Sequence, residues 1–304
     1  MIRRLPLLAP CLFPALAFGL DFEVKTDLEH TRHPVSNEIK YEDDGSFDER
    51  DYRHKTGYES KTLLLLSDAW SEQLDWELRL GMQYDRTRDT KREFREDGSL
   101  KKDKSRTEWQ SSPILGLGFS YDMGRLLGGY HWRLSGYHDR FVDVAYKATS
   151  LAEDAKPRAG RGDGYESRLR LDAEYMTPVS SLFFSPRLEV THERYSQWYD
   201  TARERDEAAE QELQYEASLW VNWIPPLNGW EVTLGPTWQL EDKAERDTDT
   251  GQWEWEDEER WIGRVQLEYE APLPGFEFEF KVERDLNGPD RDKMKYEAGL
   301  SYEF

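Results

Sequence analysis

The sequence predicts an all-β protein that forms a closed antiparallel transmembrane β-barrel of about 12 strands, with 14 as the alternative count. Apolar and polar residues alternate in segment after segment, and the links between these segments are alternately short and long. The chain also carries 12 Trp, 16 Tyr and 13 Phe, although its mean hydropathy is −0.90 and its net charge is −21. Acidic disordered chains are poor in aromatic residues, so these rings must be buried or anchored. A barrel with lipid outside and water inside satisfies both faces of every strand.

The N-terminus is typical of a secretory signal peptide, which we expect to comprise residues 1–17. Two arginines precede an apolar run that ends in the small-x-small site Ala15-Leu16-Ala17. Lipidation at Cys11 is the alternative, although the apolar run continues past that residue. Residues 18–304 would then form a single barrel domain in the bacterial outer membrane.

Taken in order, twelve alternating segments are expected to be strands. They span residues 20–32, 55–67, 73–87, 106–121, 129–146, 164–176, 181–195, 212–224, 229–242, 259–271, 275–285 and 292–304. Short links join the second segment to the third, the fourth to the fifth, and so on, whereas the other links are long and charged, except residues 286–291. An even strand count with short turns at one end and long loops at the other is typical of outer-membrane barrels. Pro186 and Pro236 fall inside expected strands, where a missing donor breaks the ladder unless a bulge is present.

The two faces of single segments support this prediction. In residues 73–87, for example, apolar side chains from Leu74 to Tyr84 alternate with polar ones from Asp75 to Asp85. Aromatic residues near the segment ends are expected to form the two interfacial girdles. They are Trp76, Tyr84, Trp132, Tyr175, Trp223, Trp230, Trp261, Tyr269, Tyr302 and Phe304.

The last nine residues, Tyr296 to Phe304, alternate strictly and end on an aromatic residue. This ending resembles the closing strand of bacterial outer-membrane barrels, in which it is recognised for insertion. The resemblance implies that Tyr302 and Phe304 form the insertion signal and that the barrel-assembly machinery is a partner.

A barrel of twelve strands has a backbone diameter of roughly 24 Å, which leaves a bore on the order of 10 Å between side chains. Eight basic residues on the polar faces are candidates to line this bore, most of them at similar distances from the short turns. They are Lys25, Arg79, Arg133, Arg168, Arg170, Arg187, Arg264 and Lys281. Carboxylates lie nearer the short turns. Two interpretations stay open: the charges pair across the bore and hold it round, or they form a constriction that attracts acidic solutes.

Several stretches resemble the small monomeric porins of the oligogalacturonate-specific porin family. They are Leu20-Asp21-Phe22-Glu23-Val24, the hairpin from Leu63 to Tyr84 and the ending from Tyr296 to Phe304. The resemblance implies twelve strands and an arginine-lined bore that passes acidic oligosaccharides. The last third, from Trp253 onward, is similar to the OmpG-type monomeric porins, which have fourteen strands. The inner face predicted here carries more carboxylates than the strongly basic bore of the first family.

The function we predict is therefore that of an outer-membrane porin, a passive channel for small sugars or oligosaccharides, acidic ones included. A structural or adhesin-like barrel without an open pore is the alternative. An outer-membrane phospholipase or protease is disfavoured, because Ser135 and His138 have opposite strand parity beside Asp139 and lack an oxyanion element. We expect no enzyme activity, no cofactor, no metal site and no nucleic acid partner. Outer-membrane lipid and lipopolysaccharide are the expected surroundings, and a monomer is the expected state.

Overall fold

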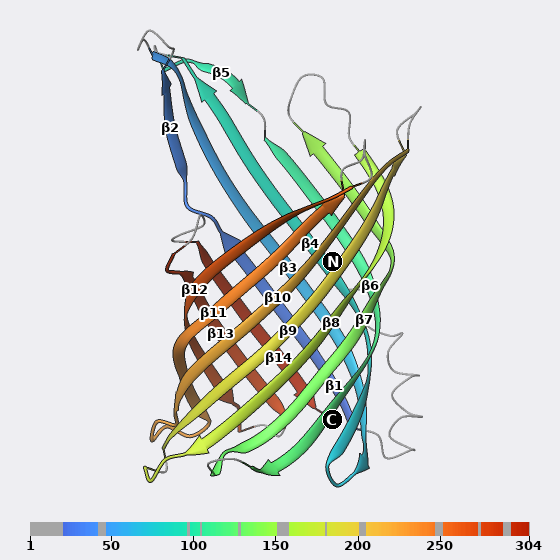
Figure 1. The fold of residues 1–304 in the computed structure, drawn as a ribbon, viewed down its shortest axis with the longest axis vertical. Coiled ribbons are helices and arrows are strands. Elements are labelled where there is room, and N and C mark those ends of the chain that lie inside the picture. The colour runs from blue at the N-terminus through green and yellow to red at the C-terminus, as the bar shows by residue number, and fades with distance from the viewer. Residues whose placement is uncertain are drawn as a thin grey trace.

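In a computed structural model, antiparallel strands wind around one axis as a tall barrel (Figure 1). The structure describes residues 21–41, 47–95, 98–103, 105–126, 129–150, 158–179, 181–200, 205–246, 252–272, 275–287 and 293–303. The strands are β1 (Asp21–Arg32), β2 (Ser36–Tyr41), β3 (Phe47–Ser71), β4 (Leu74–Phe94), β5 (Leu100–Asp103), β6 (Arg106–Arg125), β7 (His131–Ser150), β8 (Arg158–Met176), β9 (Leu182–Asp200), β10 (Arg205–Trp223), β11 (Trp230–Arg246), β12 (Trp253–Glu270), β13 (Phe276–Asp285) and β14 (Met294–Glu303).

Twelve of these strands close the ring, which confirms the predicted fold class and strand count. β1 pairs with β14 on one side and with β3 on the other, and every further neighbour in the ring is antiparallel. β2 and β5 lie outside the ring, because they pair only on the outer edges of β3 and β4. The four strands together form an extension that projects beyond the long-loop end of the barrel (Figure 1).

The strands reach further towards the long-loop end than the alternation predicts. β3 begins at Phe47 and β4 ends at Phe94, whereas the sequence pattern indicated strands over 55–67 and 73–87. The pairing of Arg50 with Phe94 shows that the ladder continues through charged sequence. Outside the lipid both faces of a strand are wet, so pairing persists there without the alternation that a membrane imposes.

Each proline interrupts the ladder on one edge of its strand only. Pro186 pairs with Leu219 and Pro236 with Gly263. On the other edge pairing lapses at residues 185–186 against β8 and at residues 235–236 against β10, without a shift of register. The register shifts where β7 carries one extra residue between Phe141 and Ala145, and the shift is present against both β6 and β8. This bulge contains Asp143, whose φ of 53° is the left-handed conformation that bulges use.

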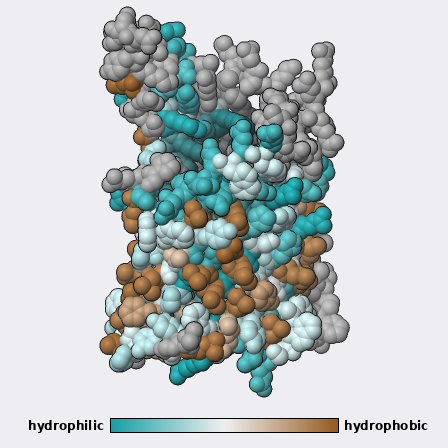
Figure 2. Space-filling view, in the orientation of Figure 1, coloured by the Kyte–Doolittle hydropathy of each residue, from teal (hydrophilic) through white to brown (hydrophobic). Residues whose placement is uncertain are grey.

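On the face shown in Figure 2, the wall is largely apolar over its short-turn half and polar above it. Outward leucines such as Leu117, Leu188 and Leu219 are exposed in the isolated chain, as lipid-facing residues must be. Aromatic pairs lie at the short-turn end, where the rings of Trp230 and Tyr269 are 4.8 Å apart. No helix of the described residues is long and apolar enough to cross a membrane.

Deleting Phe304 is expected to lower the amount of assembled barrel without lowering synthesis. Phe304 and residues 1–17 lie outside the described residues, but Tyr302 pairs with Val24 of β1 and Phe276 of β13, so the C-terminal strand closes the ring. Heat-modifiable gel mobility of the membrane fraction, compared with total protein, measures assembly. Tyr302→Ala should have a smaller effect. Normal assembly after the deletion would show that the ending is a strand and nothing more.

Candidate functional site in the barrel lumen

The eight basic residues singled out in the sequence occupy inward strand positions, but the structure divides them among separate ion pairs. Strands in a barrel are staggered, so residues equally far from the short turns lie at different heights. In six of the eight, a side-chain nitrogen lies within 3.3 Å of a carboxylate oxygen. These six are Arg79, Arg168, Arg170, Arg187, Arg264 and Lys281. Lys25 lies 3.8 Å from Asp27. Among the described residues Arg133 makes no ion pair.

The most buried pair joins Arg79 of β4 to Asp139 of β7. Arg79 Nε donates to Asp139 Oδ1 at 2.7 Å and Nη2 to Oδ2 at 3.2 Å, and Asp139 is fully buried. β6 lies between the two strands, and Gly116 is the residue that pairs with both partners. A side chain at Gly116 would meet the Asp139 carboxylate, so the glycine lets the pair form over β6.

Lys61 of β3 extends this pair across the lumen. Its ammonium lies 3.1 Å from Glu166 Oε2 on β8 and 3.5 Å from Asp139 Oδ2, although β3 and β8 are four steps apart around the ring. Tyr137 donates its hydroxyl hydrogen to Glu166, and the Arg79 guanidinium lies 4.0 Å from the Tyr137 ring centroid. We call Lys61, Arg79, Tyr137, Asp139 and Glu166 the lumen bridge. It narrows the bore because one side chain spans part of its width.

The inner face is not polar throughout, because an apolar block lies on the same strands as the lumen bridge. It consists of Leu63, Leu65, Ile114, Phe141 and Val144, with Tyr195 packed against it. Phe141 and Tyr195 stack with centroids 5.2 Å apart, and Gly164, which pairs with both, leaves the space between them open. The block lines one side of the lumen with buried carbon.

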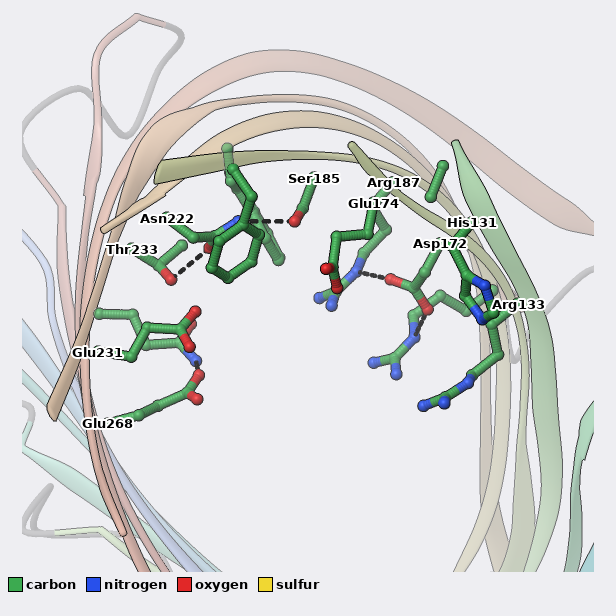
Figure 3. A pocket seen from close by; sticks show the side chains of 15 residues that line it. His131, Arg133, Asp172, Glu174, Ser185, Arg187, Asn222, Glu231, Thr233 and Glu268 are labelled. Carbon is green, nitrogen blue, oxygen red and sulfur yellow. Dashed lines mark hydrogen bonds and ion pairs between the residues drawn. The ribbon is translucent and has the colours of Figure 1, made fainter. Parts of the chain in front are cut away.

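A cavity of about 280 Å³ opens at the short-turn end of the lumen, between β7 and β12 (Figure 3). His131 and Arg133 lie on one side of it, and the carboxylates of Glu231 and Glu268 lie on the other. Opposite charges across a confined opening create a transverse field. Arg133 is exposed, and it faces this opening.

Two further arginines of the cavity share one carboxylate. Arg187 Nε lies 2.6 Å and Arg170 Nε 2.7 Å from the oxygens of Asp172. The Arg187 guanidinium also lies 4.1 Å from the Trp220 ring centroid, and Arg264 lies 4.8 Å from it on the same ring. Glu174 lines the same side of the cavity (Figure 3), so two guanidinium groups and two carboxylates lie together here, and stacking on Trp220 holds the Arg187 guanidinium in place.

Lys61, Tyr137 and Trp220 were missed in the sequence, and each one breaks the simple alternation. Lys61 is followed by Thr62 and then by four leucines, so its strand has apolar residues on both faces. Trp220 lies inward between outward Leu219 and Val221. The sequence signal that could have identified Trp220 is a failure of alternation. Three consecutive apolar residues in a barrel strand indicate that one of them faces the lumen.

The residues of the disfavoured catalytic set do not come together. His138 Nδ1 is 2.7 Å from Ser167 Oγ on the outer face, whereas Asp139 is bound to Arg79 inside the barrel. Within the described ranges, no group of three or more His, Cys, Asp and Glu side chains is arranged to hold a metal ion.

The fold is that of bacterial outer-membrane β-barrels. The transport unit of the autotransporter AIDA-I from Escherichia coli is similar with a TM-score of 0.61 and 8% identity, over 93% of this chain and 90% of that one. The translocator domain of the autotransporter NalP from Neisseria meningitidis has a TM-score of 0.56 and 12% identity, over 98% and 95%. An outer-membrane channel from Pseudomonas putida F1 has a TM-score of 0.53 and 14% identity, over 94% and 96%.

Sequence comparisons add no family to this structural similarity. No protein-family model matches the chain, and no curated protein matches it.

Proposed function

We propose that this protein is an outer-membrane channel through which small hydrophilic solutes, sugars and short oligosaccharides among them, diffuse passively. The observation that carries the proposal is the cavity at the short-turn end, which has charged walls of both signs and an exposed Arg133 without an ion pair in the described chain. If the charges of the inner face served only to stabilise the barrel, each cation would be expected to pair with a carboxylate, and Arg133 does not.

The lumen bridge and the apolar block set the expected size limit. Both lie on the β3 to β9 side of the barrel. Inward side chains on the opposite wall, such as Glu241, Arg264 and Glu283, are buried as well, so we expect a narrow path. We propose passage of monosaccharides and disaccharides, with a modest preference for acidic over neutral sugars, because the carboxylates of Glu231 and Glu268 offset the arginines. We also propose that residues 1–17 are removed and that the barrel is a monomer without enzyme activity.

The purified protein should give discrete and steady current steps in a planar bilayer, because the proposed pore is a fixed wall. Liposomes that contain the protein should admit monosaccharides and exclude long oligosaccharides. Heat-modifiable mobility serves as the control that the inserted protein is folded. A folded barrel that neither conducts nor admits sugars would favour the alternative, a structural or adhesin-like barrel.

A further inference from the structure

The outer wall of the barrel carries a group of basic residues directly above its apolar band. On β4 the outward series Leu78, Leu80, Met82 and Tyr84 continues as Arg86 and Arg88. Outward positions at the corresponding end of β7 and β9 carry further cations. We call Arg86, Arg88, Arg140, Lys147 and Arg194 the outer cationic belt.

Two rows of this belt have the same construction, an aromatic residue between two cations on the flanking strands. Trp109 of β6 pairs with Arg86 of β4 and Lys147 of β7, and the two cations lie 6.0 and 5.8 Å from its ring centroid. Tyr165 of β8 has Arg140 and Arg194 as its register partners, and its ring packs against His138 and His192 with centroids 5.5 and 5.4 Å away. The cations of one row stand about 10 Å apart, two strand spacings.

The belt differs from the lumen in its ion pairs. Six of the eight lumen arginines and lysines discussed above are held closely by carboxylates, whereas in the described chain none of the five belt cations takes part in an ion pair. All five are exposed. The chain has 62 acidic residues for 41 basic ones, so exposed cations that no carboxylate of the described chain binds point to an anion from outside the chain. Among the described residues of β4 and β6 to β9, two outward carboxylates lie near the belt: Asp143, which Arg161 binds at 2.7 Å, and Asp163.

The height of the belt identifies the kind of anion. Apolar side chains lie directly below it, so the partner has to carry its charge next to acyl chains. At the short-turn end the described outward positions of β4 and β6 to β9 are apolar or aromatic, such as Trp76 and Tyr175, and none of them is Lys or Arg. The barrel wall is therefore basic at one membrane surface and not at the other. This difference matches a bilayer in which only the outer leaflet is strongly anionic.

We propose that the outer cationic belt binds the phosphate groups of a phosphorylated glycolipid of the outer leaflet, of the lipid A type, with Trp109 and Tyr165 at its sugar headgroup. The flanking guanidinium and ammonium groups pair with the phosphates, and the acyl chains lie on the apolar band below. This site requires the membrane orientation given by the fold and does not require an open channel.

The test measures lipid binding by the folded protein in detergent, with bisphosphorylated lipid A and the same lipid without phosphates as probes. The variant Arg86→Ser/Arg140→Ser/Arg194→Ser should bind bisphosphorylated lipid A roughly a hundredfold more weakly, since each basic residue near a membrane contributes about a fivefold factor. The variant with lysine at the same three positions should retain most of the binding. Native mass spectrometry or calorimetry gives the affinities.

A matched control removes three exposed cations that face inward, in the variant Lys55→Ser/Arg125→Ser/Arg133→Ser. It has the same net charge as the first variant, and its affinity should stay within about threefold of the wild-type value, given the distance of these residues from the lipid. Heat-modifiable mobility establishes that each variant is folded. Equal losses in the two serine variants, or equal binding of the dephosphorylated lipid, would overturn the proposal.

Discussion

Replacing Arg79 with leucine is expected to lower the free energy of unfolding by about 3 kcal/mol, because it leaves the fully buried Asp139 without its bidentate partner. Removal of one member of a buried ion pair typically costs about 3–5 kcal/mol. The lower end applies here, since Lys61 keeps its contact with Asp139 at 3.5 Å. Denaturant titration of the refolded barrel measures the change. The double variant Arg79→Leu/Asp139→Leu should recover most of the loss, because the buried carboxylate is removed together with its partner. Lys61 keeps Glu166, and Glu77, which Arg79 Nη1 contacts at 2.6 Å, is 27% exposed and remains hydrated.

The chain offers a matched control for this experiment. Arg161 binds Asp143 with the same residue types at the same 2.7 Å, but their side chains are 76% and 59% exposed. Arg161→Leu should therefore cost less than about 1 kcal/mol. If Arg79→Leu costs no more than Arg161→Leu, water reaches the lumen bridge freely, and the bore is wide and wet at that height.

The fold was predictable from sequence because lipid imposes a pattern on every spanning strand. Alternation placed twelve strands and the inner and outer faces of residues such as Arg79 and Leu80, and link lengths separated the two ends of the barrel. The projecting extension was not predictable in this way. Where β2 and β5 pair on β3 and β4, both faces are wet, so the sequence there resembles a charged loop.

The candidate site was less predictable than the fold, for two physical reasons. The stagger between neighbouring strands sets the relative heights of inward residues and so determines which of them come into contact. No local pattern of the sequence shows this stagger. Glycines on intervening strands add contacts between strands that are not neighbours, as Gly116 does for Arg79 and Asp139. Inward position was therefore predictable for Arg170 and Arg187, but their shared contact with Asp172 was not.

Replacing Arg170 and Arg187 together with serine is expected to shift the reversal potential of the channel towards cation selectivity and to raise its conductance. The two guanidinium groups share Asp172 in the wall of the cavity, and Glu174 lines the same side, so their removal takes two positive charges from this wall and leaves both carboxylates there. Of the arginines that line the cavity, only Arg133 then remains opposite Glu231 and Glu268. Serine is also much smaller than arginine, so the opening widens. Bilayer recordings in a salt gradient measure both quantities.

The control for this experiment replaces Arg32 and Arg284 with serine, which removes the same charge from outward positions on β1 and β13. Charges outside the wall are separated from the permeating ions by the sheet and screened beyond about 10 Å, so the reversal potential should not move. If the Arg170→Ser/Arg187→Ser variant leaves both quantities unchanged while it is folded, the ions do not pass the cavity at the short-turn end. The conducting path would then lie elsewhere, or the barrel would be closed at the lumen bridge, where Lys61 reaches Glu166.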